Sequence, residues 1–208
     1  MKGKFITLEG PDGSGKSTNV NVLVDCLKSR GYDVIKTREP GGTELGEKIR
    51  ALLLNDEMCP KAELLLFAAQ RAEHIEKTIK PALFCGKIVI SDRFYDSTYA
   101  YQGARGYIFD VLQLEDFVHK GFQPDYTLFF NIPFEESLKR LSIREGVGGG
   151  DRFEKEKIDY KRLVYHYYQD RFKIHSDRMV EIHAEHTADV VALQVVNWAC
   201  NTFPAITE

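Results

Sequence analysis

Residues 10–17 read GPDGSGKS, and this stretch decides the fold. It matches G-x-x-x-x-G-K-[ST] in full, a pattern that marks a phosphate-binding loop when a strand precedes it and a helix follows it. Residues 5–8 form a short apolar run typical of a buried strand, and residues 17–30 repeat apolar side chains at helical spacing up to Gly31. The sequence therefore predicts a phosphate-binding loop (P-loop) between a strand and a helix.

The chemistry of this loop explains its composition. Glycines allow backbone N–H groups to turn toward phosphate oxygens, and the N-terminus of the following helix adds a favourable dipole. Lys16 brings a positive charge to the β- and γ-phosphates, and the Ser17 hydroxyl suits Mg²⁺. A glycine-rich turn with a chance lysine is the alternative, which the motif and its context together disfavour. We expect ATP to contact Gly10, Pro11, Asp12, Gly13, Ser14, Gly15, Lys16, Ser17 and Thr18.

The rest of the chain alternates short β-branched apolar runs with helical patterns. Further strands are predicted at residues 32–36, 87–91, 126–131 and 179–183, and further helices at 43–54, 62–84, 112–120, 134–144, 155–178 and 188–200. The helix over 62–84 contains Pro81, where it could break. Such alternation implies an α/β fold whose parallel sheet is covered by helices on both faces.

Composition limits the classes of protein that fit. The chain has 208 residues, 43% of them hydrophobic, which suits one domain with a sizeable core. Its net charge of −3 disfavours a nucleic acid as the main partner, so we expect small anionic ligands. The four cysteines (Cys26, Cys59, Cys85 and Cys200) show no metal-binding spacing, and no apolar run approaches membrane-spanning length. We expect one cytoplasmic domain over 1–208, with reduced thiols and no membrane partner.

The third predicted strand ends in Asp92 and Arg93. Ligands of open parallel sheets bind at the carboxyl ends of the strands, where this pair would lie. Asp92 could hold Mg²⁺ directly or through water, and Arg93 could bind a second phosphate with two hydrogen bonds. The alternative is an ordinary surface ion pair.

Five segments along the chain carry a more specific signal. They are residues 8–18 (LEGPDGSGKST), 37–43 (TREPGGT), 66–71 (LFAAQR), 91–103 (SDRFYDSTYAYQG) and 124–128 (PDYTL). Together they resemble the thymidylate kinase family over nearly the whole chain, and the second and fourth are much more specific than the P-loop. The resemblance implies a doubly wound parallel sheet of the P-loop nucleoside monophosphate kinase type with a small helical lid. It also implies a homodimer that uses Mg²⁺ and ATP to phosphorylate dTMP to dTDP in dTTP synthesis.

Phe67 and Arg71 are four residues apart on a predicted helix, so they share a face. An aromatic ring can stack on a base while a guanidinium points at its edge. Because thymine offers a carbonyl acceptor where cytosine offers an amino donor, a donor-only arginine favours thymine or uracil. Spacing alone favours the alternative, in which Phe67 packs on the apolar face and Arg71 is solvated, and the resemblance reverses that preference.

The resemblance assigns the remaining contacts to dTMP. Arg38 and Arg93 would hold the acceptor phosphate, and Asp12 would lie near the acceptor sugar and the metal. The resemblance also places a polar contact to the base at Thr98, a ring that crowds the sugar 2′ position at Tyr101, and part of the same wall at Gln102. Arg38 could instead be a surface charge at a strand end, and Tyr101 a buried helix aromatic.

The glycine-rich residues 145–150 (EGVGGG) cannot hold a helix, so a jointed lid is predicted over approximately 137–155. Phosphoryl transfer needs positive charge on the transferring group and exclusion of water, which a lid carrying arginines can supply. The alternative is a charged helix that faces solvent. The three candidate lid arginines are Arg140, Arg144 and Arg152.

The thymidylate kinase family that this chain resembles has two designs of active site. In one of them, a small residue follows the acidic residue of the P-loop, and the lid supplies the catalytic arginine. Gly13 follows Asp12, so this chain resembles that design. We choose Arg144 for the transition state and Arg152 second, while Arg140 would cover the adenine of ATP. The stretch after Arg144 is longer than usual for the family, which weakens the choice between the arginines.

The expected catalytic set is Lys16, Arg144, Asp12 and Arg93, with Ser17 and Asp92 as metal ligands. One rival interpretation is a kinase for uridylate or cytidylate, which Phe67, Arg71 and Tyr101 argue against. Another is a P-loop switch that binds ATP without turnover. Arginines for a second phosphate disfavour that interpretation, since a switch has no acceptor.

Overall fold

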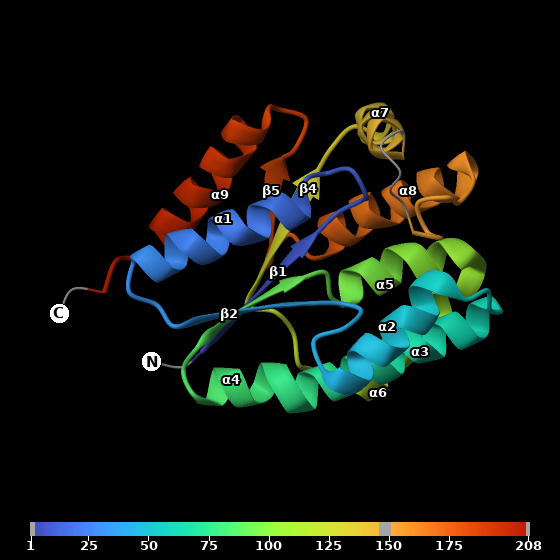
Figure 1. Ribbon diagram of the computed structural model, residues 1–208, viewed down its shortest axis with the longest axis horizontal. Coiled ribbons are helices and arrows are strands. Elements are labelled where there is room, and N and C mark those ends of the chain that lie inside the picture. The colour runs from blue at the N-terminus through green and yellow to red at the C-terminus, as the bar shows by residue number, and fades with distance from the viewer. Residues whose placement is uncertain (1–2, 146–150, 207–208) are drawn as a thin grey trace.

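The computed structural model describes residues 3–145 and 151–206, without the side chains of 144 and 145. The described residues form a five-stranded parallel sheet in the order β2-β3-β1-β4-β5 (Figure 1). The strands are β1 (Lys4–Glu9), β2 (Val34–Arg38), β3 (Ile88–Asp92), β4 (Tyr126–Asn131) and β5 (Met179–His183). Each begins and ends within two residues of the predicted bounds. The predicted doubly wound α/β fold is confirmed.

Helices connect the strands and cover the sheet. They are α1 (Lys16–Ser29), α2 (Glu44–Asn55), α3 (Pro60–His74), η1 (Ile75–Ile79), α4 (Lys80–Phe84), α5 (Tyr95–Gln102), η2 (Gly103–Tyr107), α6 (Ile108–His119), α7 (Phe134–Glu145), α8 (Ile158–Ile174) and α9 (Ala188–Thr202). The predicted helix over 62–84 is a continuous run of α3, η1 and α4, in which η1 is a π-helical turn shortly before Pro81.

Side chains along β1 alternate between two helical layers. Ile6 and Leu8 pack into an apolar cluster with α1 and α9. Phe5 points to the opposite face, where η1, α4 and the start of α5 cover the sheet. Further along that second face, Phe129 of β4 packs against α5 and α8. This burial on both faces explains why the strands are near-continuous apolar runs.

Two helix predictions need correction. The sequence pattern does not predict α5, because its polar residues are buried together with its aromatic ones and no apolar stripe results. The helix predicted over 155–178 is too long, since α8 spans only Ile158–Ile174. Arg178 lies beyond its end and pairs with the buried Asp96 of α5 at 2.7 Å.

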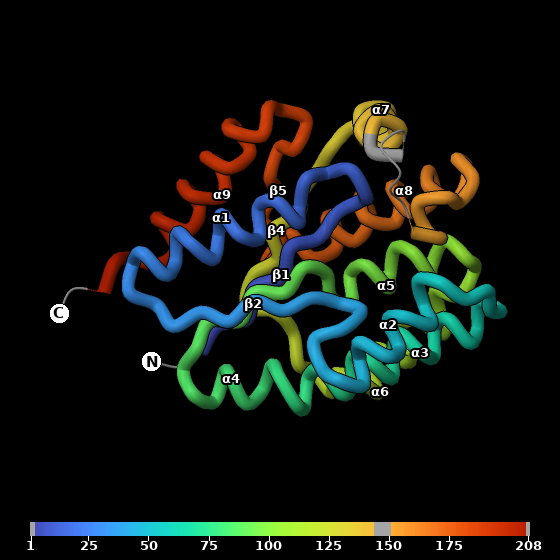
Figure 2. The backbone as a smooth tube through the Cα atoms, in the orientation of Figure 1, coloured from blue at the N-terminus to red at the C-terminus, as the bar shows by residue number. Residues whose placement is uncertain are grey.

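The helices gather in two groups around the sheet. Figure 2 shows α1 beside α9 on one side, and α2, α3 and α6 together at the opposite side. Within residues 3–145 and 151–206, no helix is long and apolar enough to cross a membrane.

Candidate active site

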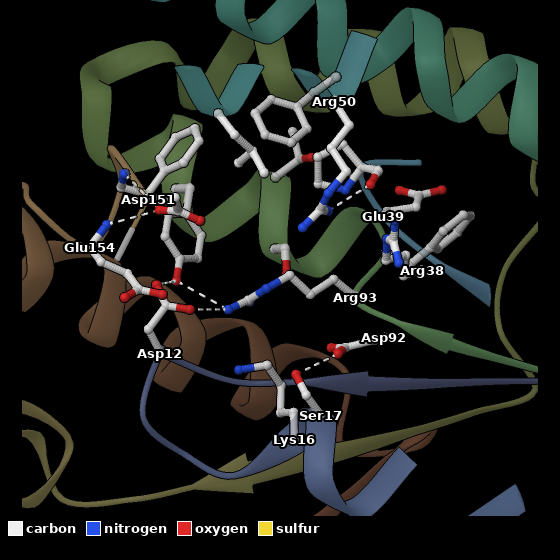
Figure 3. Close-up of a pocket in the computed structure, with 18 of the residues that line it drawn as sticks. Asp12, Lys16, Ser17, Arg38, Glu39, Arg50, Asp92, Arg93, Asp151 and Glu154 are labelled. Atoms are coloured by element: carbon white, nitrogen blue, oxygen red, sulfur yellow. Dashed lines mark hydrogen bonds and ion pairs between the residues drawn. The ribbon is translucent and has the colours of Figure 1, made fainter. Parts of the chain in front are cut away.

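A cavity of about 420 Å³ lies at the carboxyl ends of the central strands. The predicted residues that line it are Asp12, Gly13, Gly15, Lys16, Ser17, Thr18, Arg38, Phe67, Arg71, Asp92, Arg93, Thr98, Tyr101, Gln102 and Arg140. The structure thus brings together residues of the P-loop, α1, β2, α3, β3, α5 and α7. Figure 3 shows Lys16, Ser17 and Asp92 on one side of this space, with Arg38 and Arg50 on another.

The P-loop is held in shape by its own lysine. Nζ of Lys16 donates to the carbonyl of Pro11 at 2.8 Å and to Oγ of Ser14 at 3.3 Å. Pro11, Ser14 and Gly10 belong to the loop but do not line the cavity. Burial of the Lys16 ammonium, and next the nearby charge of Arg93, lower the pKa of Lys16 to about 7. A bound triphosphate would restore the charged form.

Gly13 is the point where α7 packs on the P-loop. Its φ of 80° is left-handed, and a Cβ there would lie 2.8 Å from the carbonyl oxygen of Ser137. Oγ of Ser137 also donates to the carbonyl of Asp12 at 3.2 Å. The close approach of α7 therefore explains why a larger residue does not fit at this position.

Ser17 and Asp92 form the pair predicted for a metal. Oγ of Ser17 donates to Oδ2 of Asp92 across 2.7 Å, and both residues line the cavity (Figure 3). The described part of the chain has no group of three or more acidic, histidine or cysteine residues suited to a metal ion. One hydroxyl and one carboxylate fit Mg²⁺, which keeps several waters and takes its other oxygens from phosphates.

Arg93 joins the P-loop to α5 and α8. Its φ of 71° is left-handed, which is uncommon outside glycine and is found at functional sites. Nη2 donates to Oδ1 of Asp12 at 2.5 Å, and Nη1 donates to the carbonyl of Gly10 at 3.0 Å and to the hydroxyl of Tyr168 at 2.9 Å. The Tyr101 hydroxyl donates to the other Asp12 oxygen at 2.5 Å. These bonds fix the Asp12 carboxylate inside the cavity.

Arg71 is buried, so the alternative of a solvated side chain is wrong. Nε donates to Oε2 of Glu39 at 2.7 Å, and Nη2 donates to Oγ1 of Thr98 at 2.8 Å and to the Phe94 carbonyl at 3.1 Å. Burial alone would raise the pKa of Glu39, but Arg71, and after it His74, lower it overall. Arg71 and Phe67 therefore face the cavity from one fixed helix face.

Gln102 is part of a polar network centred on the buried Glu63 of α3. Nε2 of Gln102 donates to Oε1 of Glu63 at 2.8 Å, and Nε of Arg105 reaches the same oxygen at 2.9 Å. Nη2 of Arg152 lies 2.7 Å from the other oxygen of Glu63. Nε of Arg152 also donates to the Leu53 carbonyl at 2.7 Å. Arg152 thus connects the segment before α8 to α2 and α3, and it does not line the cavity.

Of the other two candidate lid arginines, the structure describes the side chain of Arg140 alone. Arg140 lines the cavity, and its guanidinium donates to the carbonyls of Ala184 (2.8 Å) and Glu185 (3.2 Å) in the segment after β5. The side chain of Arg144, and residues 146–150 of the predicted lid, lie outside the described residues.

Some residues around the cavity escaped the sequence analysis. They are Glu39, Pro40, Arg50, Leu54, Phe94, Ser97, Asp151, Phe153 and Glu154. Nη1 of Arg50 donates to the Pro40 carbonyl at 2.8 Å, and nothing in the spacing of α2 marked it. Residues 151–154 directly follow the glycine-rich stretch. That position could have identified all four as candidate site residues, but only Arg152 was chosen from it.

Glu9 is a further missed residue, at the end of β1 directly before the P-loop. Its carboxylate is buried and accepts bonds of 2.6 Å from the Phe94 amide and from Oγ of Ser97. Burial, and then the charge of Asp96, raise the pKa of Glu9 to about 7. An acidic residue that closes an otherwise apolar strand was the signal that could have found it.

Fold and cavity together place this chain in the class of P-loop nucleoside monophosphate kinases. The loop that binds a triphosphate and the arginines able to bind a second phosphate face the same space. The family model for thymidylate kinase matches residues 8–195. The chain belongs to the thymidylate kinase family.

Individual thymidylate kinases can be aligned with this chain over most of their length. A thymidylate kinase from Methylobacillus flagellatus is 43% identical over 199 residues, covering 95% of this chain and 97% of the relative. One from Halothermothrix orenii is 46% identical and covers 89% and 95%. One from Pseudomonas fluorescens strain SBW25 is 52% identical over 161 residues and covers 75% of each.

Proposed function

We propose that this member of the thymidylate kinase family transfers the γ-phosphoryl group of Mg·ATP to dTMP, giving ADP and dTDP for dTTP synthesis. The observation that carries the proposal is that the P-loop Lys16 and the buried Arg71 line one cavity. A donor phosphate and an acceptor base can therefore be held in the same cavity. Positioning and charge stabilisation suffice for this reaction, and no covalent intermediate is needed.

On the donor side, Lys16 would neutralise the β- and γ-phosphates while the P-loop amides bind their oxygens. Mg²⁺, when bound, would neutralise phosphate charge between Ser17 and Asp92. Arg140 would cover adenine, since its bonds to the carbonyls of Ala184 and Glu185 hold it at the edge of the cavity.

On the acceptor side, Arg38 and Arg93 would bind the dTMP phosphate. Arg38 pairs with Glu47 at 2.8 Å and is half-exposed at the cavity, so it can turn toward a ligand at little cost. Arg93 is instead fixed by bonds to the P-loop and α8. Arg50 lines the same part of the cavity and would add positive charge there.

For the base, we assign Nη1 of Arg71 to the thymine O4 carbonyl. The other guanidinium nitrogens, Nε and Nη2, already donate to Glu39 and Thr98. Phe67 would stack on the ring, because both side chains face the cavity from α3. For the sugar, Asp12 would accept from the 3′-hydroxyl and Tyr101 would crowd the 2′ carbon.

For the lid, we propose that Arg144 supplies charge in the transition state. Arg152 is a weaker candidate because Glu63 and the Leu53 carbonyl already hold it away from the cavity lining. The compact P-loop at Gly13 supports a lid-supplied arginine, since there is no room for a side chain there.

We further propose a homodimer that pairs the faces formed by α2, α3 and α6. Large apolar side chains are exposed on these helices, with Phe109 at 78% and Phe117 at 73% of full exposure on α6. Leu52 of α2 and Leu65 of α3 add to them. Apolar residues gathered on neighbouring helices are typical of a surface that a partner covers.

The activity test measures ADP formation with and without dTMP, and with Mg²⁺ or a chelator. We expect release of ADP to require both dTMP and Mg²⁺, and to be lost in Lys16→Ala but kept in Lys28→Ala, an exposed lysine of the same helix. ADP release that ignores dTMP would identify an ATPase, and ATP binding without turnover would identify the switch.

A further inference from the structure

Four side chains from the end of β2 and from α3 form a continuous line of hydrogen bonds that ends at Arg71. Oγ1 of Thr37 lies 2.7 Å from Nε2 of His74, and Nδ1 of His74 lies 2.8 Å from Oε1 of Glu39. Oε2 of Glu39 accepts the bond of 2.7 Å from Nε of Arg71. All four residues are buried, with His74 at 0% exposure. Neither Thr37 nor His74 lines the cavity, so these two side chains can act on a ligand only through the rest of the line.

The direction of each bond follows from the charges. Glu39 already pairs with the Arg71 guanidinium, so its carboxylate is ionised and only accepts hydrogen bonds. Nδ1 of His74 must therefore carry a proton. A second cation beside this ion pair would be buried without a counter-charge of its own, which is costly, so we assign a neutral ring to His74. Its Nε2 then accepts a hydrogen bond from the Thr37 hydroxyl.

The loop after β2 packs directly on the bond between Thr37 and His74. Gly42 has a left-handed φ of 78°, and a Cβ there would lie 2.5 Å from Nε2 of His74 and 2.6 Å from Oγ1 of Thr37. This close backbone leaves no room for water to replace the hydroxyl. Loss of the Thr37 hydroxyl would therefore leave Nε2 of His74 buried without its donor, which costs more than the bond itself contributes.

We propose that Thr37 and His74 are positioning residues for recognition of the acceptor base, an inference that rests on the proposed role of Arg71. Thr37 fixes the neutral Nδ1–H tautomer of His74, and His74 holds one oxygen of Glu39 so that the other oxygen meets Nε of Arg71. The plane of the guanidinium is set in this way, with Nη1 left for the base. Neither Thr37 nor His74 touches a substrate, and both act through the line of hydrogen bonds.

The kinetic experiment removes the hydroxyl at the start of the line. Thr37→Val keeps the shape of the side chain, and we expect it to raise KM for dTMP by about fivefold to tenfold while kcat and KM for ATP stay within about twofold. Thr37→Ser returns the hydroxyl and should restore the wild-type KM. The matched control is Thr78→Val, which removes a hydroxyl bond of 2.9 Å to the Gly42 carbonyl of the same loop but lies outside the line. Thr78→Val should leave KM for dTMP unchanged.

A second measurement determines the tautomer in the free protein and does not depend on a Thr37 variant that folds. Two-bond ¹H–¹⁵N spectra of histidine-labelled protein show which ring nitrogen carries the proton, and the His74 signals are those lost in His74→Asn. We expect a neutral ring that is protonated at Nδ1. A ring protonated at Nε2, or a charged ring, would overturn the proposal.

The kinetic outcomes separate this proposal from the proposed function. If the wild type forms no dTDP, the proposed function fails and the positioning role fails with it. If the wild type forms dTDP but Thr37→Val and Thr78→Val have the same KM for dTMP, the kinase assignment stands and the positioning role alone is refuted. A rise in KM for dTMP confined to Thr37→Val, with rescue by Thr37→Ser, is the result that we expect.

Discussion

Nε of Arg71 lies 2.7 Å from Oε2 of Glu39, and this ion pair is almost fully buried beside the cavity. Glu39 directly follows β2, whereas Arg71 comes from the last turn of α3. The other oxygen of the same glutamate accepts a hydrogen bond from Nδ1 of His74 at 2.8 Å. The pair thus fixes the guanidinium that we assign to the thymine carbonyl.

We predict that Glu39→Gln weakens dTMP binding more than ATP binding. Removing one charge of a buried pair leaves the Arg71 guanidinium uncompensated, which should lower the free energy of unfolding by about 3 kcal/mol. Urea unfolding and KM for each substrate measure the two effects. The matched control is Glu44→Gln, which breaks the exposed pair with Lys48 and should change neither quantity. Equal effects of the two variants would refute the positioning role of Glu39.

We predict that ATP binding takes up a proton at Lys16 above pH 7. Because burial lowers the pKa of Lys16 to about 7 in the free protein, the amine is mostly neutral at pH 8 and charged at pH 6. Triphosphate binding restores the charge, so about 0.9 proton is taken up at pH 8 and about 0.1 at pH 6. ATP affinity should then fall by about tenfold per pH unit above 7.

Calorimetry in two buffers of different ionisation enthalpy measures this proton uptake. The control is Lys16→Arg, whose side chain stays charged at either pH and should lack this contribution. If the variant takes up as many protons as the wild type at pH 8, the proton does not go to Lys16.

We predict that Arg144→Ala lowers kcat far more than it weakens dTMP binding, by roughly 10³-fold if the arginine acts mainly in the transition state. Arg152→Ala should instead lower stability and raise KM, because its contacts are with Glu63 and the Leu53 carbonyl. Single-turnover kinetics and thermal melts separate the two. A large loss of kcat in Arg152→Ala with Arg144→Ala unaffected would exchange their roles.

We predict that Tyr101→Ala relaxes the choice of deoxyribose over ribose more than it slows catalysis. A ring at the 2′ carbon rejects a hydroxyl that would be buried without a partner, which costs about 1–3 kcal/mol and gives roughly tenfold to hundredfold discrimination. Tyr101→Phe keeps the ring and removes only the hydroxyl, with its bonds to Asp12 and Arg93, so it should retain the discrimination. The measurement is kcat/KM for dTMP and ribothymidylate, and an unchanged ratio in Tyr101→Ala would contradict the assignment.

The strands and the P-loop could be predicted from the sequence, because each is marked by a pattern among residues that are neighbours in the chain. The apolar run before the loop identified β1, and four further runs identified the rest of the sheet. The sequence pattern did not predict α5, because the burial of this helix depends on residues that are far apart in the chain. Its polar residues are buried by partners far away in sequence, such as Arg171 and Arg178 against Asp96, so no periodic stripe marks it.

Site residues could be predicted from the sequence where a motif or the family resemblance identified them. They were harder to predict where tertiary packing determines the position of the side chain. Spacing placed Phe67 and Arg71 on one face, but burial of Arg71 depends on Glu39, more than thirty residues away. The sequence indicated Arg152 as a candidate lid arginine, but its side chain pairs with Glu63 of α3.

The most direct test of the account compares kcat/KM for dTMP and dCMP under saturating Mg·ATP. The two acceptors share the sugar and the phosphate, so Arg38, Arg93 and Asp12 cannot distinguish them. Arg71 can, since it only donates hydrogen bonds and cytosine presents a donor where thymine presents O4. The account predicts dTDP formation with kcat/KM at least about a hundredfold above that for dCMP. Equal values for the two acceptors, or a preference for dCMP, would contradict it.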